Sequence, residues 1–139
     1  MIYLQLEEYE KLLEHAVKCL PEEACGLIGG MKDDRGNTYI EKVYLLENTD
    51  HSEEHFSLDP RGQLTAVKEM RAKGWKPLGN WHSHPASPSR PSEEDKRLAY
   101  DSSALYLILS LMERGVPVLN AFHIEGSRVE KEEIRYIQG

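Results

Sequence analysis

The stretch GNWHSHPASPSRPSEEDKRLAY, residues 79–100, places two histidines one residue apart, then a loop rich in proline and serine, then an acidic helix start. On a β-strand, side chains at i and i+2 project from the same face about 6.6–7 Å apart, so His82 and His84 can reach one ion. Two imidazoles suit Zn²⁺, Cu or Fe better than Mg²⁺ or Ca²⁺, and a catalytic zinc takes three protein ligands. Asp95, which opens the helix after the loop, is the expected third ligand.

A simpler interpretation of the same residues exists. Ser92 and Asp95 also match a capping box, with Ser92 as the N-cap, and an isolated histidine pair is usually a surface feature. The joint occurrence of both patterns, separated by a loop that prolines stiffen, favours a metal site, and Ser92 can serve both purposes. A hydrolase also needs a base beside its metal. Glu22 and Glu23 both lie just before a predicted strand, and their spacing does not indicate which of the two would be the base.

Length and composition favour one domain spanning residues 1–139. The formal net charge is −7, which disfavours nucleic acid as a partner. Two cysteines, Cys19 and Cys25, are too few for a disulfide framework. No signal peptide or membrane-spanning stretch is recognisable, so the expectation is a cytoplasmic protein with no membrane partner.

Hydrophobic periodicity predicts the order of the elements. Apolar residues at helical spacing predict a helix over 6–20 that Pro21 ends. A second helix begins at Asp59-Pro60 and ends at Gly74. The apolar stripe of this second helix is expected to consist of Leu64, Val67 and Met70. A third helix is expected from Ser92 to about Tyr100. The expected strands cover residues 24–31, 38–47, 76–84, 104–111, 116–124 and 128–137. This order predicts an α/β or α+β fold, with one mixed central sheet flanked by helices.

Three short segments, in this order, resemble the JAMM (MPN+) zinc metalloprotease motif of the small stand-alone prokaryotic type: Glu23-Ala24-Cys25-Gly26, His82-Ser83-His84-Pro85 and Ser92-Glu93-Glu94-Asp95. The resemblance implies a cytidine-deaminase-like α/β fold that holds one Zn²⁺ through His82, His84, Asp95 and a water. It also implies that Glu23, two residues before the Cys-Gly pair, is the general base. Ser92 matches the serine that stabilises the oxyanion of the tetrahedral intermediate.

The activity that this resemblance implies is hydrolysis of a peptide or isopeptide bond after the C-terminal Gly-Gly tail of a ubiquitin-like protein. A sulfur carrier is the favoured substrate, because the chain has little room for the insertions of larger deubiquitinases. The expected fit is an extended tail added to the sheet as an edge strand. The alternative is a non-catalytic MPN-type scaffold that binds protein partners without zinc. The sequence leaves a possible homodimer open.

Other histidines and cysteines offer weaker candidates. Residues 51–55, HSEEH, match the inverted zincin motif H-x-x-E-H, but they lie outside any predicted helix, so a solvated loop near the cleft is expected. A zinc deaminase would need His-x-Glu and Pro-Cys-x-x-Cys, and the sequence contains neither. Cys25 is expected to pack as a small apolar residue behind the site, and His15 and His123 are expected to be structural.

Overall fold

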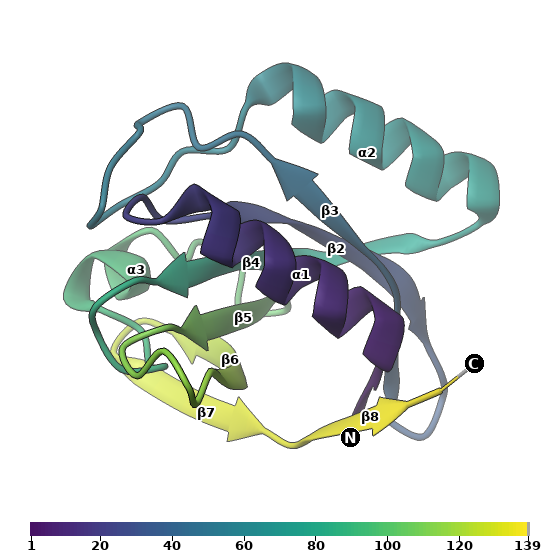
Figure 1. Ribbon diagram of the computed structural model, residues 1–139. Helices are drawn as coiled ribbons and strands as arrows, with labels where there is room; N and C mark the ends of the chain where they lie inside the picture. Colours follow the sequence, from purple (N-terminus) through teal and green to yellow (C-terminus); the bar gives the residue numbers. More distant parts are fainter. Residues whose placement is uncertain (139) are drawn as a thin grey trace.

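The computed structural model describes residues 1–138, and within this range the chain forms one eight-stranded mixed sheet with three helices (Figure 1). The strand order is β7-β6-β5-β4-β2-β3-β1-β8. The helices are α1 (Leu6–Cys19), α2 (Pro60–Lys73) and α3 (Glu93–Arg97). The strands are β1 (Ile2–Gln5), β2 (Cys25–Lys32), β3 (Thr38–Leu46), β4 (Lys76–His84), β5 (Leu105–Ser110), β6 (Val118–Glu125), β7 (Arg128–Glu132) and β8 (Ile134–Ile137).

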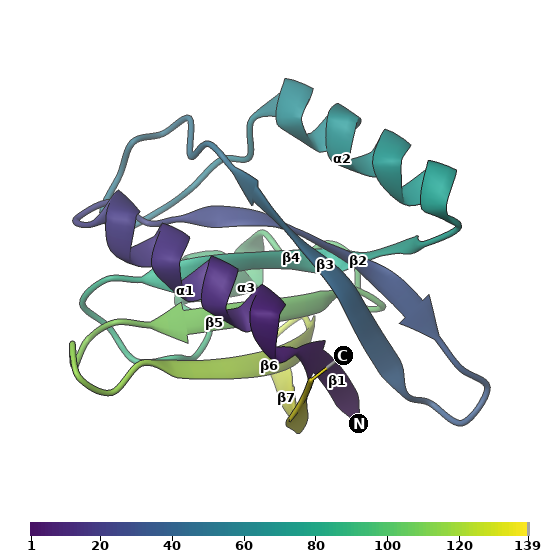
Figure 2. The ribbon, with the colours of Figure 1, turned by 45° about the vertical axis from the view of Figure 1, so that its right-hand side comes forward.

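The helices cover opposite faces of this sheet (Figure 2). Leu12 and Ala16 of α1 are fully buried in the main core, which lies between α1 and one face of the sheet. Met70 and Ala66 of α2 pack on the other face, in a smaller cluster with Tyr44. No helix among residues 1–138 is long and apolar enough to cross a membrane.

The expected apolar stripe on α2 is wrong in part, because Leu64 is 57% exposed. An α-helix turns about 100° per residue, so successive i+3 steps drift by about 60° and three such residues cannot share a narrow face. Ala66 and Met70, four residues apart, stay nearly in line. They form the buried face, and a Cβ added at Gly29 of β2 would lie 2.9 Å from the Met70 side chain. The small residue at position 29 thus makes room for Met70.

The two ends of the sheet are linked by the last strand segment, which differs from the single predicted strand over 128–137. Its first half, β7, pairs with β6, whereas its second half, β8, pairs in parallel with β1. The change of partner occurs at Glu133, whose carbonyl oxygen accepts a hydrogen bond from the amide of Ile2 at 3.0 Å. The sheet therefore curls so that β1 and β8 lie side by side (Figure 1). Strand β1 itself was not predicted.

Helix α3 is also shorter than predicted, since it ends at Arg97 rather than near Tyr100. None of its residues is buried, so little packing energy supports further turns. Its acidic first turn faces the end of β4, because Asp95 lies beside His82 and His84.

The register between β2 and β4 is the feature of the fold that positions the site. Gly26 pairs with Trp81, and Cys25 pairs with His82. A Cβ at position 26 would lie 1.7 Å from the carbonyl oxygen of Tyr44 and 2.5 Å from Trp81 Nε1. Only glycine leaves room for Trp81 Nε1 to donate its hydrogen bond to that carbonyl, at 3.0 Å. This contact holds β4 beside the strand that Glu23 precedes.

Candidate metal centre

Two histidines at the end of β4 point to the same face of the sheet. The Nε2 atoms of His82 and His84 lie 3.1 Å apart, and both side chains are buried. Trp81 and Ser83, which alternate with them, are fully buried on the opposite face. Strand alternation therefore presents the two imidazoles together, as the spacing in the sequence predicts.

The first turn of α3 brings a carboxylate to the same point. Asp95 Oδ2 lies 3.2 Å from Nε2 of His82 and 3.2 Å from Nε2 of His84. The capping box is formed as well, since Asp95 Oδ2 accepts the Ser92 amide at 2.9 Å and Ser92 Oγ accepts the Asp95 amide at 3.0 Å. The cap and the approach to the histidines are thus compatible, and the cap orients the carboxylate.

The three groups fit a small divalent cation. Their ligand atoms all lie within 4.8 Å of one another. Distances of 3.1–3.2 Å between them are close to the edge of about 3.3 Å expected for a tetrahedron with metal–ligand bonds of about 2.0 Å. His84 Nδ1 lies 2.8 Å from the Pro88 carbonyl oxygen. A carbonyl can only accept, so Nδ1 carries the proton and the Nε2 lone pair faces the other ligands.

The electrostatics of the group also favour a cation. Burial lowers the pKa of His82, so this ring remains neutral and keeps a lone pair. Burial opposes charge on His84, but Asp95, the Pro88 carbonyl and Glu23 together raise its pKa. Burial would raise the pKa of Asp95, yet the two histidines beside it hold that pKa well below its usual range. An ionised carboxylate beside two closely spaced imidazole nitrogens is a suitable donor set for Zn²⁺.

One wall of the centre comes from a residue that the sequence did not single out. The ring of Phe56 stacks on the His82 ring, with a centroid distance of 4.6 Å and an interplanar angle of 25°. Nδ1 of His82 is buried and has no hydrogen-bond partner within residues 1–138. Phe56 lies next to the HSEEH stretch, and its stacking could not be read from any local pattern.

Glu23 lies in the turn between α1 and β2 and is only 5% exposed. The next residue is tied to the metal strand, because the Ala24 amide donates to Ser83 Oγ at 2.8 Å. Burial raises the pKa of Glu23 to about 8, the charge of His84 lowers it, and Asp95, Glu94 and Glu54 raise it. A carboxyl group that titrates near neutral pH can both accept and return a proton under working conditions.

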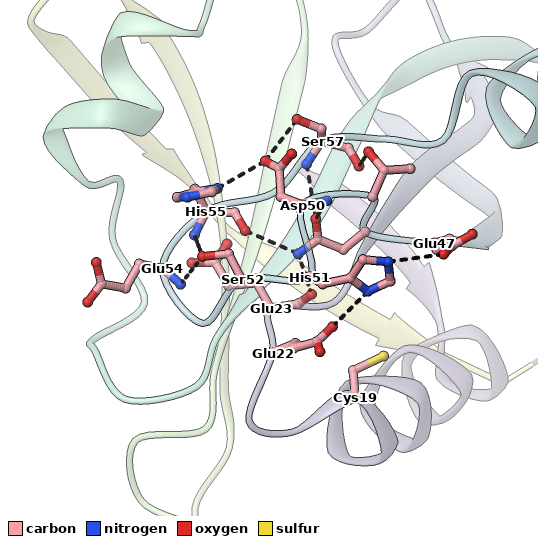
Figure 3. A network of polar contacts seen from close by, with 12 residues as sticks. Cys19, Glu22, Glu23, Glu47, Asp50, His51, Ser52, Glu54, His55 and Ser57 are labelled. Atoms are coloured by element: carbon pink, nitrogen blue, oxygen red, sulfur yellow. Dashed lines mark hydrogen bonds and ion pairs between the residues drawn. The ribbon is translucent and has the colours of Figure 1, made fainter.

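The structure distinguishes the two glutamates that spacing left equal. The Glu22 carboxylate points to His51, with Oε1 3.3 Å from His51 Nδ1, and it is 40% exposed (Figure 3). Glu23 is buried and close enough to His84 and Asp95 for their charges to shift its pKa. Ser92 is exposed at the mouth of α3, and its hydroxyl hydrogen remains available to a ligand, because Oγ accepts from Asp95.

The HSEEH stretch does not form a second metal group within residues 1–138, where only His82, His84 and Asp95 meet the geometric requirement. It lies outside any helix, as expected, and its histidines turn to different partners. His51 lies between Glu22 and Glu47, and His55 Nδ1 lies 2.9 Å from Asp50 Oδ2 (Figure 3). These side chains hold a surface loop together.

The remaining cysteines and histidines have structural surroundings. Cys25 is fully buried and pairs in the sheet with His82, and burial raises its thiol pKa to about 12, which leaves it a poor nucleophile. It therefore packs beside the centre, close to the expected position. His123 Nε2 lies 2.6 Å from a carboxylate oxygen of Glu132, and His15 packs edge-on against Trp81.

Comparison with known proteins places this chain in a family. Residues 6–124 match the family described as prokaryotic homologs of the JAB domain. The chain is 25% identical over 138 residues to the CysO-cysteine peptidase of Mycobacterium tuberculosis, covering 99% of this chain and 92% of that protein. A protein of Desulfitobacterium hafniense, solved in solution, is 54% identical with a TM-score of 0.91, covering 100% of this chain and 94% of that one.

The fold is also shared with a more distant structure. A JAB1/MPN domain protein from Archaeoglobus fulgidus has a TM-score of 0.61 at 22% identity, covering 99% of this chain and all of that one. This likeness confirms the JAB/MPN fold that the motif implied. The chain belongs to the prokaryotic homologs of the JAB domain.

Proposed function

We propose that this protein is a zinc-dependent peptidase that hydrolyses the bond after the C-terminal Gly-Gly tail of a ubiquitin-like protein, with a sulfur carrier as the favoured substrate. The observation that carries the proposal is the convergence of His82, His84 and Asp95 beside a buried glutamate whose pKa is about 8. The name of a relative along nearly the whole chain, a CysO-cysteine peptidase, supports peptide hydrolysis as the reaction.

Each residue has a distinct role in this mechanism. His82, His84 and Asp95 would hold Zn²⁺, which when bound supplies a Lewis acid that polarises a carbonyl oxygen and acidifies water. Glu23 takes a proton from the attacking water and passes it to the departing amine nitrogen, which a pKa near neutral permits in both directions. The Ser92 hydroxyl donates a hydrogen bond to the oxygen on which negative charge develops.

The structure changes the expected route of the substrate tail. Strand β4 is paired with β2 on one side and with β5 on the other, so within residues 1–138 this strand offers no free edge to which a tail could be added. A cleft of about 420 Å³ instead runs along the same face of β4, lined by Asn80 two residues before His82 and by Leu58, Gln63, Leu98 and Tyr100. We propose that the tail lies in this cleft.

Cleavage of a defined carrier tests the proposal. The purified protein would be incubated with a ubiquitin-like sulfur carrier that has extra residues after its Gly-Gly, and the intact mass would be followed. We expect mass loss at that junction, abolished by a chelator and by Glu23→Ala but not by the exposed neighbour control Glu22→Gln. Cleavage by Glu23→Ala at the wild-type rate would refute the assigned base. A protein that neither cleaves nor purifies with zinc would be a scaffold.

A further inference from the structure

A buried asparagine just after β3 contacts the main chain of Glu23 and the main chain of the loop that follows β3. Asn48 is 7% exposed, and its amide uses its full hydrogen-bonding capacity. Nδ2 donates to the Glu23 carbonyl oxygen at 3.0 Å and to the His55 carbonyl oxygen at 3.1 Å. Oδ1 accepts the amides of Asp50 at 3.0 Å and Ser57 at 3.1 Å. A side chain without both donors and acceptors would leave buried main-chain groups unpaired.

These contacts organise the whole segment 49–57 around the asparagine. The base of the segment is closed by a bridge between Asn48 and Leu58, and the Thr49 amide donates to the Ser57 carbonyl oxygen at 3.0 Å. The Asp50 carboxylate accepts from Ser57 Oγ at 2.9 Å (Figure 3). The segment is therefore a closed loop, with the asparagine amide at its centre.

The closed loop contacts two residues of the metal centre. The amide of Glu23 donates to the Ser52 carbonyl oxygen at 2.8 Å, and Asn48 binds the carbonyl oxygen of the same residue. Both main-chain polar groups of Glu23 are thus held by this loop and its asparagine. Phe56, from the same loop, stacks on His82.

We propose that Asn48 is a positioning residue for Glu23: its amide fixes the main chain from which the Glu23 carboxylate reaches the metal centre. The inference rests on the proposed function for the role of Glu23, whereas the holding of its main chain is independent of that role. A displacement of about 1 Å in a catalytic group lowers rates by about 100-fold. The metal ligands lie on β4 and α3, outside this loop, so we expect the protein to bind metal without the Asn48 amide.

Kinetics test the catalytic part of the proposal. We expect Asn48→Ala to lower kcat by about 10- to 100-fold, with KM and zinc content close to those of the wild type. Thr49→Ala is the matched control, because it removes a hydrogen bond from Oγ1 to the Ser57 carbonyl oxygen within the same loop, at 3.3 Å, without reaching Glu23. An unchanged kcat, a rise in KM alone, or zinc loss in proportion to lost activity would overturn the proposal.

Asn48→Asp tests whether the amide donor is needed. This variant keeps the shape and the acceptor oxygen but replaces the group that donates to the Glu23 carbonyl oxygen. We expect the same fall in kcat as for Asn48→Ala, and wild-type turnover would overturn the proposal. If Asn48→Ala does not fold, as judged by circular dichroism, Asn48→Asp replaces it in every measurement. Unfolding of both variants would also overturn it, because Asn48 would then support the fold rather than Glu23.

Hydrogen exchange of the metal-free protein, without substrate, separates this inference from the proposed function. We expect the Glu23 amide to exchange at least 10-fold faster in Asn48→Ala, because its acceptor at Ser52 lies in the released loop. The Ser83 amide, which donates to the Ala24 carbonyl oxygen at 2.9 Å, is the internal control and should be unchanged. Wild-type protection of the Glu23 amide would contradict the proposal. A wild-type protein that cleaves no substrate would refute only the proposed function.

Discussion

Replacing the buried carboxyl group of Glu23 by an amide should stabilise the metal-free protein. Its pKa is about 8 in the folded chain, compared with 4.5 when unperturbed, and burial is the main cause. Between these two values the folded state binds one more proton than the unfolded state, so stability falls as pH rises. Below about pH 4.5 both states are protonated, and above about pH 8 both are ionised. The loss of folding stability is therefore absent below about pH 4.5 and complete above about pH 8.

The magnitude follows from the distance between pH 7 and the unperturbed pKa. That distance is about 2.5 units, and each unit corresponds to about 1.36 kcal/mol. Ionisation of Glu23 in the unfolded chain, while the folded chain keeps the proton, therefore lowers folding stability at pH 7 by about 3 kcal/mol. Glu23→Gln keeps the volume of the side chain and removes this cost. We expect the free energy of unfolding of the variant to exceed that of the wild type by about 3 kcal/mol at pH 7, and by almost nothing at pH 4.5.

Urea unfolding at several pH values between 4.5 and 8 measures this difference, with a chelator present throughout. The difference should grow by about 1.4 kcal/mol per pH unit. Bound zinc should reduce the stability difference between Glu23→Gln and the wild type, because a nearby cation favours the ionised carboxylate. Glu22→Gln, at an exposed position, should show no such trend. A difference that does not change with pH, or a less stable Glu23→Gln at pH 7, would refute the reasoning.

Three further substitutions test the centre and its support. Asp95→Asn should weaken zinc binding by at least about 100-fold, as measured by calorimetric titration. This loss is larger than the loss typical of residues that only orient a metal ligand. Unchanged zinc affinity would mean that Asp95 is only a helix cap. Ser92→Ala should lower kcat by about 100- to 1,000-fold while zinc is retained, and an equal loss of zinc would point to the cap instead. Gly26→Ala should destabilise the fold by about 3 kcal/mol or more in thermal unfolding, because the added Cβ would lie 1.7 Å from the Tyr44 carbonyl oxygen. A melting temperature close to that of the wild type would contradict this prediction.

The sequence was informative about features that depend on neighbouring residues. Helix α1, strands β2 to β6 and the start of α2 follow local periodicity and punctuation by proline and glycine, and the structure confirms them within a few residues. The grouping of His82, His84 and Asp95 could also be foreseen, since one strand, one loop and one helix turn contain all three. Short separations along the chain left little freedom in how they meet.

Features that depend on distant parts of the chain could not be foreseen. The pairing of β1 with β8 joins the two ends of the described chain, and four residues of strand propensity at Ile2–Gln5 give only a weak local signal. The roles of Asn48 and Phe56 depend on contacts with residues distant in the sequence, since Asn48 binds the Glu23 carbonyl oxygen and Phe56 stacks on the His82 ring. An asparagine that binds four main-chain groups has no characteristic sequence pattern, because its partners are present in every residue.

The register of β4 connects the stability of the fold to its chemistry. Side chains alternate along a strand, so a slip of one residue against β2 would turn His82 and His84 into the core and bring Trp81 and Ser83 to the metal face. The contact of Trp81 Nε1 with the Tyr44 carbonyl, over the space left by Gly26, specifies one register. The buried carboxyl group of Glu23 works against folding at neutral pH, whereas the Trp81 side chain is fully buried on the opposite face of the sheet from the histidines. Stability is thus supplied on the α1 face of the sheet, which leaves the opposite face to hold groups that destabilise the fold but suit the reaction.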